Sequence, residues 1–189
     1  MAKLSEGVLI SGRGSNMAAL IDAAANVPTV TVSHRDHPDR EVFDRAVAAA
    51  LERHGVEFVV LAGFMRIFSP WFPTRWAGRL INIHPSLLPA FKGLHVQRQA
   101  LDAGVRLSGC TAHFVTPDLD SGPIIAQAAV PVVAGDTEET LSARILRQEH
   151  RLYPLVVRWF AEGRIAVDGE KVAVQGVPRG ATLLFSPEA

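Results

Sequence analysis

The stretch FVVLAGFMRIFSPWFPTRWAGRLINIHP (58–85) contains two short apolar runs separated by a helical segment. The runs, 58–62 and 80–83, have the length and composition of buried strands, and 69–77 has the pattern of a short helix. A strand that returns to its sheet through a helix lies parallel to the strand before it. This stretch therefore predicts an α/β fold with a parallel sheet.

The rest of the chain shows the same alternation, which predicts a Rossmann-like, mostly parallel twisted sheet flanked by helices, with a long C-terminal helix and a small hairpin. Further strands are expected at 8–11, 29–32, 110–115 and 124–130, and further helices at 15–25, 39–54, 96–103 and 137–162. Pro154 lies inside the last helix, where we expect a kink or a break because proline removes a helical hydrogen bond. The hairpin is expected around Asp168-Gly169, between the runs 164–167 and 171–174.

The length of 189 residues suits a single domain, 1–189, with a loose tail from about residue 177. Hydrophobic residues make up 48% of the chain and charged residues 20%, a globular rather than a disordered composition. Lys+Arg and Asp+Glu both number 19, and this balance argues against a broad nucleic-acid footprint. The lone cysteine, and the lack of an export signal or long apolar run, predict a cytoplasmic protein with no membrane partner.

The motif SGRGSN (11–16) lies between an expected strand and an expected helix. Its glycines let the backbone approach a ligand, and the helix start offers free N–H groups, so the motif predicts a phosphate site. The alternative is a glycine-rich turn that binds nothing. The motif has neither the full dinucleotide fingerprint nor the lysine of a triphosphate loop.

Asn82 and His84 lie two residues apart at the end of a strand, so alternation gives both side chains the same face. Ligands of open α/β sheets bind beyond the carboxyl ends of the strands. An amide donor beside an imidazole can stabilise an oxyanion, and the imidazole can transfer protons near neutral pH. Taken alone, however, an Asn-x-His pair is more often bonded to nearby backbone groups.

The motif DLDSGP (118–123) places two carboxylates in a turn between expected strands. Asp, Ser, Gly and Pro are ordinary turn residues, which is one explanation. The functional explanation is a carboxylate that orients and charges a histidine. The sequence alone does not pair Asp120 with His84.

Glu149 continues the apolar stripe of the long helix, formed by Leu141, Ile145, Leu152, Val156 and Trp159. A charge on a buried face is costly unless it is paired, so Glu149 is a candidate binding residue; the alternative is a broad stripe with Glu149 on its solvated side. Cys110 lies in an apolar strand and is expected in the core. The cluster HRDHPD (34–39) is expected to be a solvated turn, and no motif predicts a metal site.

Taken together, six segments resemble the phosphoribosylglycinamide formyltransferase family of folate-dependent formyltransferases. They are ISGRGSN (10–16), DREVFDRA (39–46), VVLAGFMRIFSP (59–70), GRLINIHPSLLPAFKGLH (78–95), TAHFVTPDLDSGPII (111–125) and GDTEETLSARILRQEHRLYPLVVRWFAEGR (135–164). They follow one another in the family's order and cover most of the chain. The loop NIHPSLLP with a later D-x-G-P is shared across folate-dependent formyl transferases, so the specificity lies in the combination.

The resemblance implies a cytoplasmic enzyme of purine synthesis that transfers a formyl group from 10-formyltetrahydrofolate to the amine of glycinamide ribonucleotide. It implies no metal, no nucleic acid and no membrane partner, and a monomer or homodimer. It also implies three groups of site residues: a catalytic set of Asn82, His84 and Asp120; a substrate set of Gly14, Ser15 and Asn16, for the phosphate, with Glu149; and a folate set of Arg40, Met65, Arg66, Ile67 and Phe68, with Asn82.

Three other functions compete. Methionyl-tRNA formyltransferase shares the loop, but we would then expect a further C-terminal nucleic-acid domain and a basic excess. Formyltetrahydrofolate hydrolase shares the core, but it carries an N-terminal regulatory domain. A non-catalytic nucleotide-binding module would explain the glycine-rich loop and leave Asn82, His84 and Asp120 unexplained.

Between Asn16 and Arg40 the chain is shorter than the family pattern by roughly 25–30 residues, about one strand–helix unit. Residues 17–22 match the first helix and 23–28 the end of a second, with the join at 21–26. Either the chain lacks the unit, or the sequence omits residues there. We favour the omission, because the motifs on both sides are intact; a Cα spacing well beyond about 3.8 Å would mark it. In either case the helix after the phosphate loop has less support, so substrate-phosphate binding is the expected role most in doubt.

Overall fold

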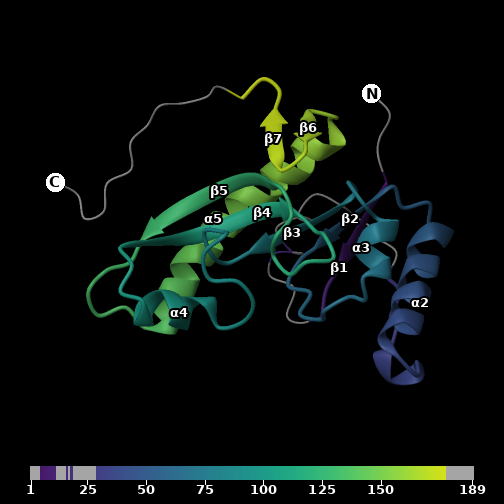
Figure 1. Ribbon diagram of the computed structural model, residues 1–189, viewed down its shortest axis with the longest axis horizontal. Coiled ribbons are helices and arrows are strands. Elements are labelled where there is room, and N and C mark those ends of the chain that lie inside the picture. Colours follow the sequence, from purple (N-terminus) through teal and green to yellow (C-terminus); the bar gives the residue numbers. More distant parts are fainter. Residues whose placement is uncertain (1–4, 12–15, 17, 19–28, 178–189) are drawn as a thin grey trace. The chain divides into compact units, whose positions relative to one another are not determined.

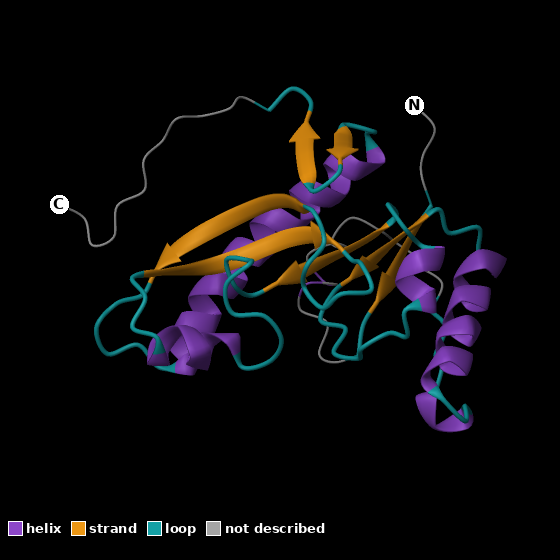
Figure 2. Ribbon diagram, viewed as in Figure 1, coloured by secondary structure: helices purple, strands orange, loops and turns teal. Residues whose placement is uncertain are grey.

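The computed structural model describes residues 5–11, 16, 18 and 29–177 (Figures 1 and 2). The described strands of the larger sheet lie in the order β1-β2-β3-β4-β5, and β6 and β7 form a second, two-stranded sheet. By contacts the chain falls into two compact units, Met1–Asn82 with Phe114–Asp118, and Ile83–His113 with Leu119–Ala189. The α/β class with a mixed, mostly parallel sheet is confirmed, whereas the single domain over 1–189 stays a prediction.

The first unit is built on parallel strands. β1 (Glu6–Leu9) pairs with β2 (Phe58–Leu61), and β2 pairs with β3 (Leu80–His84). The register joins Leu9 to Leu61 and Leu61 to Asn82, so the three carboxyl ends lie at one edge. The helices of this unit are η1 (His34–Asp36), α2 (Arg40–Arg53) and α3 (Trp71–Arg75), and its core contains Phe43, Val47, Ala48, Leu51, Val59, Leu61, Phe72, Trp76 and Leu80.

The boundaries of α2 follow directly from its sequence. Asp39 is the N-cap, and its carboxylate accepts a hydrogen bond from the Val42 amide at 2.9 Å. Phe43, Val47 and Leu51 lie on one buried face at helical spacing. Gly55, with φ of 65°, follows the end of the helix in the left-handed conformation that glycine adopts without strain.

The second unit pairs β4 (Leu107–Phe114) with β5 (Ile124–Pro131) in antiparallel fashion, with an irregularity at Ala112/His113. The long helix α5 (Glu138–Ala161) packs against β5 and against α4 (Val96–Asp102). β6 (Ile165–Asp168) and β7 (Lys171–Val174) form the expected hairpin. The buried face of α5 carries Leu141, Ile145, Glu149, Tyr153, Val156, Val157 and Trp159.

Of the kink or break expected at Pro154, the break is wrong, because α5 continues through that residue to Ala161, and the kink stays a prediction. A capping box begins the helix, in which Thr137 and Thr140 each accept a hydrogen bond from the other's amide. Proline removes only its own hydrogen bond. Tyr153 and Val156 on either side are fully buried, and their packing holds the helix together across that gap.

The expected strand at 29–32 is also wrong, since this stretch belongs to neither sheet. Its β-branched residues suggested a strand, but β propensity depends on a paired and half-buried setting. Val30 is 50% exposed, and Thr29 and Thr31 are exposed as well. The stretch therefore has the composition of a strand but not the burial that would favour one.

Some expectations lie outside the described residues. They concern Gly12–Ser15 of the phosphate loop, most of the helix at 15–25, of which Asn16 and Ala18 are described as helical, the join at 21–26 with its Cα-spacing test, and the tail from 178.

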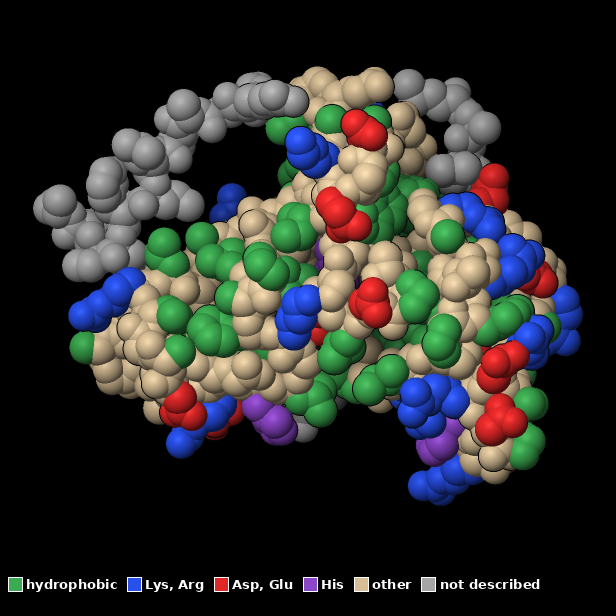
Figure 3. Space-filling model, viewed as in Figure 1, with side chains coloured by type: hydrophobic (Ala, Val, Ile, Leu, Met, Phe, Trp, Pro, Cys, Tyr) green, Lys and Arg blue, Asp and Glu red, His purple; other side chains and the backbone are tan. Residues whose placement is uncertain are grey.

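Charged side chains of both signs are interspersed over the face shown in Figure 3, in agreement with the balanced composition. In the part of the chain that the structure describes, no helix combines the length and apolar character needed to cross a membrane.

One ion pair ties the loop before α5 to the helix. Arg144 donates to both carboxylate oxygens of Asp136, at 2.7 and 2.8 Å, and to the carbonyl of Pro131 at 2.8 Å. The Asp136 side chain is only 3% exposed. The hydrogen bonds from Arg144 hold the pKa of Asp136 well below its usual range.

We predict that Arg144→Met lowers the free energy of unfolding by about 1–3 kcal/mol at neutral pH, because it leaves a shielded carboxylate without its partner. A depressed pKa contributes stability above the usual value of about 4, and that stability is lost as the pH falls below it. The difference between the wild type and the variant should therefore narrow in acid, as measured by urea unfolding. The control is Arg98→Met, whose pair with Asp102 is exposed and screened by solvent, so its unfolding should stay close to that of the wild type.

Candidate functional site

His84 ends β3 and is only 5% exposed. Its Nδ1 lies 3.6 Å from Oδ2 of Asp120, and its Nε2 donates to the carbonyl oxygen of Phe91 at 3.0 Å. Nε2 is thus hydrogen-bonded to a carbonyl oxygen, and Nδ1 faces a carboxylate oxygen beyond hydrogen-bond distance.

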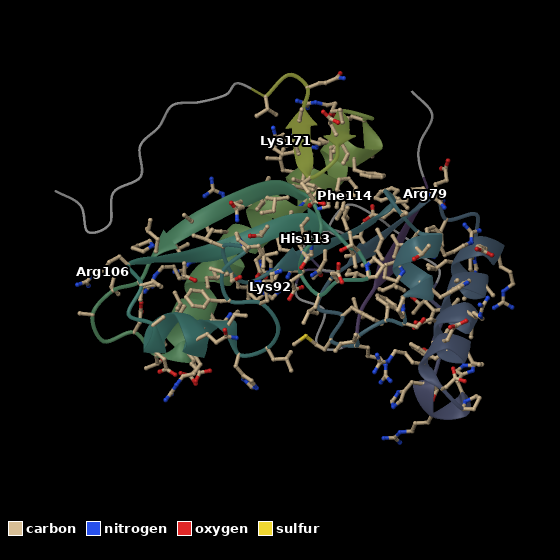
Figure 4. The ribbon with its side chains drawn as sticks, in the orientation of Figure 1. Arg79, Lys92, Arg106, His113, Phe114 and Lys171 are labelled. Atoms are coloured by element: carbon tan, nitrogen blue, oxygen red, sulfur yellow. The ribbon has the colours of Figure 1, made fainter. Side chains whose placement is uncertain are left out.

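Two loops of the second unit hold Asp120 beside His84. The amide of Gly93 donates to Asp120 Oδ2 at 2.9 Å, and Lys92 Nζ donates to Ser121 Oγ at 2.6 Å. Figure 4 labels Lys92. These two bonds connect the segment after Phe91 with the turn that carries Asp120, so the carboxylate does not depend on its own turn alone for its position.

Backbone strain is concentrated in the same loops. Phe91, His95 and Asp120 have φ of 54°, 55° and 47°, the left-handed region that residues with a Cβ rarely adopt. Each such residue costs on the order of 1–3 kcal/mol. They are the positive-φ residues other than glycine among those the structure describes; Phe91 and Asp120 contact His84, and His95 is the N-cap of α4. Strain of this kind is typical of functional sites.

A buried hydrogen-bond network fixes the loop that follows His84. The Thr111 hydroxyl accepts from the Leu88 amide at 3.0 Å and donates to the Ser86 carbonyl at 2.7 Å. Gln127, opposite Thr111 in the β4–β5 register, donates to the Leu88 carbonyl and to Thr111, both at 2.9 Å. Two neighbouring strands thus anchor the backbone just beyond the imidazole.

Glu149 is buried, at 6% exposure, so the alternative that placed it on the solvated side of α5 is wrong. Burial, and next the charge of Glu149, raise the pKa of the Cys110 thiol to about 12. Cys110 is fully buried and stays protonated at neutral pH, which makes it a core residue rather than a nucleophile. Glu149 therefore lies close enough to β4 to act on Cys110.

In the first unit, the expected folate residues lie in and beside the segment 62–69, between β2 and α3. Met65 and Ile67 are 72% and 62% exposed, and Phe68 is half-buried. Arg66 lies over the Phe43 ring, with 5.2 Å between the guanidinium carbon and the ring centroid. Arg40 begins α2 and is exposed.

The structure thus brings His84 and Asp120 together, and β3 carries Asn82 and His84 at alternate positions. Asn16 is 8% exposed, whereas Gly14 and Ser15 lie outside the described residues. The sequence did not predict Phe91, Gly93, Thr111 and Gln127 as site residues. The segment FKGLH was visible in the sequence, but nothing in it shows that a carbonyl and an amide would point at His84 and Asp120. Within the described ranges, no group of three or more His, Cys, Asp or Glu side chains is placed to hold a metal ion.

Comparison with known proteins gives consistent matches. The family model described as "Formyl transferase" matches residues 22–157. The chain is 43% identical to the phosphoribosylglycinamide formyltransferase of Escherichia coli (strain K12), over 89% of this chain and 96% of that protein. It is 47% identical to the protein of that name from Mycobacterium tuberculosis (strain CDC 1551 / Oshkosh), over 83% and 76%. The crystal structure of glycinamide ribonucleotide transformylase 1 from Symbiobacterium toebii is 44% identical, with a TM-score of 0.87 over 91% of this chain and 94% of that chain.

The alignment with the Escherichia coli protein also bears on the expected shortfall. It extends over 203 positions, more than the 189 residues of this chain, and 89% of 189 residues is about 168. About 35 of the 203 alignment positions are therefore gaps in this chain. A shortfall of this size can accommodate the strand–helix unit that the sequence between Asn16 and Arg40 lacks.

We predict that Thr111→Val lowers the free energy of unfolding by about 1–3 kcal/mol, because the Leu88 amide and the Ser86 carbonyl lose a buried partner while the shape is kept. Thermal unfolding measures the effect. The control is Thr74→Val, whose exposed hydroxyl bonds only to the Pro70 carbonyl before its own helix. An equal loss in both variants would contradict an anchoring role for Thr111.

Proposed function

This chain belongs to the formyl transferase family, and from this premise we propose that it is a phosphoribosylglycinamide formyltransferase. It transfers a formyl group from 10-formyltetrahydrofolate to the amine of glycinamide ribonucleotide, a step of purine synthesis in the cytoplasm. The observation that carries the proposal is the pairing of His84 with Asp120 at the carboxyl end of β3, in a chain 43% identical to an enzyme of this name.

The pairing fits the charge changes of formyl transfer. The substrate amine attacks the formyl carbon and forms a tetrahedral intermediate with a negative oxygen. His84, as imidazolium, stabilises that oxyanion, and Asp120 favours the charged ring. The intermediate then collapses, the bond from the formyl carbon to the folate nitrogen breaks, and that nitrogen receives a proton. The amine loses a proton in the same cycle, so His84 and Asp120 pass one proton from amine to folate, through water where needed.

Asn82 supplies a second donor to the oxyanion in this mechanism, through its side-chain amide. Its position two residues before His84 on one strand supports the role, because alternation gives both side chains the same face of β3. In the bound complex, a contact with the oxyanion replaces one of the two contacts that the His84 ring makes in the structure. The Phe91 carbonyl is the contact to exchange, since Asp120 supplies the charge that the imidazolium needs.

The remaining assignments concern binding. Met65, Arg66, Ile67 and Phe68, with Arg40 and Asn82, are proposed to bind the folate, and the two exposed apolar side chains Met65 and Ile67 offer surface for a flat ring. Gly14, Ser15 and Asn16 are proposed to bind the substrate phosphate. Glu149 is proposed to bind polar groups of the same substrate, which supplies a reason for a buried carboxylate in an apolar stripe.

The direct test is incubation with 10-formyltetrahydrofolate, with and without glycinamide ribonucleotide. Formylation of the ribonucleotide with no release of formate in its absence supports the proposal. Formate release without the ribonucleotide would indicate a hydrolase, and transfer only to methionyl-tRNA would indicate the tRNA enzyme. No turnover in any arm, with binding of the ribonucleotide, would indicate a non-catalytic module.

We predict that His84→Ala lowers kcat by at least about 10²–10³, because it removes an oxyanion donor, while the KM values for both substrates change little. Asp120→Asn should also lower kcat, because it removes the charge opposite the imidazolium. Steady-state kinetics with each substrate varied in turn measure both. The control is His54→Ala, an exposed histidine just after α2; kcat near the wild-type value in His84→Ala would falsify the mechanism.

We predict that Glu149→Gln raises KM for glycinamide ribonucleotide more than KM for the folate, since the charge acts on one substrate. The same kinetic series gives both values. Glu138→Gln, in the first turn of the same helix with a side chain that is 41% exposed and pairs with Arg98, is the matched control. Equal increases in the two KM values would count against a substrate role for Glu149.

A further inference from the structure

The segment 63–69 has no helix or strand, although its outer side chains are apolar. Met65 and Ile67 are 72% and 62% exposed, which gives this short segment little burial of its own. A segment of this kind samples many conformations unless specific contacts hold it. Two polar side chains from distant parts of the first unit, Ser11 and Asp44, provide such contacts at its two ends.

Ser11 holds the beginning of the segment. Its hydroxyl accepts a hydrogen bond from the Met65 amide at 2.6 Å and donates one to the Gly63 carbonyl at 3.3 Å. One hydroxyl thus satisfies two backbone groups that are part of no helix or sheet. Ser11 follows β1, so this contact links the ends of two neighbouring parallel strands.

Asp44 holds the end of the segment. It lies on α2, is only 1% exposed, and its Oδ2 accepts from both the amide and the hydroxyl of Ser69, at 2.6 and 2.7 Å. Burial raises the pKa of Asp44, and the bonds from Ser69 and the charges of Arg40 and Arg66 act in the opposite direction. A buried carboxylate is costly, so its retention calls for a specific role.

Aromatic stacking packs the middle of the segment against α3. The Phe64 and Phe68 rings stack with centroids 4.8 Å apart, and Phe68 stacks on Phe72 of α3 at 4.2 Å. With Phe64 and Phe68 facing inward, the intervening residues Met65 and Ile67 face solvent. The polar contacts at the ends and the stacked rings between them fix which side chains the segment exposes.

We propose that Ser11 and Asp44 are positioning residues that preorganise the segment 63–69 for the folate. The inference rests on the proposed function and deepens it: neither side chain is assigned a contact with the folate, and each acts through the backbone of the segment. Preorganisation lowers the entropy that binding must overcome, so its loss weakens binding of the ligand that the segment holds. The chemical step at His84 is unaffected.

The test uses steady-state kinetics of the full chain with 10-formyltetrahydrofolate and glycinamide ribonucleotide. Ser11→Ala and Asp44→Ala should each raise KM for the folate by about 10-fold, the effect of losing two modest hydrogen bonds. At saturating folate, kcat should stay within about twofold of wild type in both variants, as should KM for the ribonucleotide in Asp44→Ala, which lies outside the glycine-rich motif 11–16. Asp44→Asn, which keeps an oxygen acceptor for Ser69, should restore most of the folate KM.

A second readout does not depend on activity. Hydrogen exchange at the Met65 and Ser69 amides reports the two anchors directly, because each amide donates to one of the proposed side chains. Ser11→Ala should speed exchange at Met65, and Asp44→Ala at Ser69. Thr74→Ala, which removes an exposed hydroxyl from α3 in the same unit, should change neither exchange nor kinetics.

The outcomes separate the two proposals. An inactive wild type overturns the proposed function. An active wild type with an unchanged folate KM in both alanine variants overturns the positioning role alone, as do equal increases in both KM values. If Asp44→Ala fails to fold, the exposed Ser11→Ala and the variant Ser69→Ala, which keeps the amide and loses the hydroxyl, carry the test.

Discussion

The parallel register of β1, β2 and β3 is the constraint from which the rest of the first unit follows. Leu9, Leu61 and Asn82 are aligned across the three strands, so the chain leaves all three at the same edge. This alignment allows the Ser11 hydroxyl to reach the Met65 amide and the Gly63 carbonyl. The hydrophobic effect drives the pairing, since β2 is buried and apolar along its length and Leu80 and Ile81 of β3 are fully buried, and the polar residues beyond the strand ends are placed as a consequence.

Each unit buries polar side chains among its apolar ones. Asp44, Glu149 and His84 are all buried. The Asp44 carboxylate accepts hydrogen bonds from Ser69, and the His84 ring is hydrogen-bonded to the Phe91 carbonyl. Burying such groups lowers stability unless each is bonded, so a fold selected for stability alone would replace them with apolar side chains. Together with the left-handed Phe91, His95 and Asp120, they mark where stability is given up for a fixed arrangement of polar atoms.

The loops around His84 show how that arrangement is maintained. Thr111 and Gln127 belong to an antiparallel pair of strands and hold the backbone after His84 from one side. Gly93 and Lys92 tie the turn of Asp120 from the other. The sheet thereby positions residues that lie in loops, with the accuracy that the proposed proton transfer and oxyanion stabilisation require.

The sequence by itself determined the order and kind of most elements, because apolar spacing and caps are local signals. It predicted a helix at 39–54, close to α2, the strands β2 and β3, the hairpin, and most of the apolar stripe of α5, but it left open whether Glu149 is buried. The wrong predictions, a strand at 29–32 and a break at Pro154, concern elements that depend on their neighbours: a strand needs a paired, half-buried setting, and tight packing carries a helix through a proline.

Only the tertiary structure decided the site. The contacts of His84 with Asp120 and with the Phe91 carbonyl join residues that are distant in sequence or that act through the backbone. The same holds for Ser11 with Met65 and for Asp44 with Ser69. No local pattern encodes these pairings, because they arise from strand register and loop conformation, which are set by the packing of the whole unit.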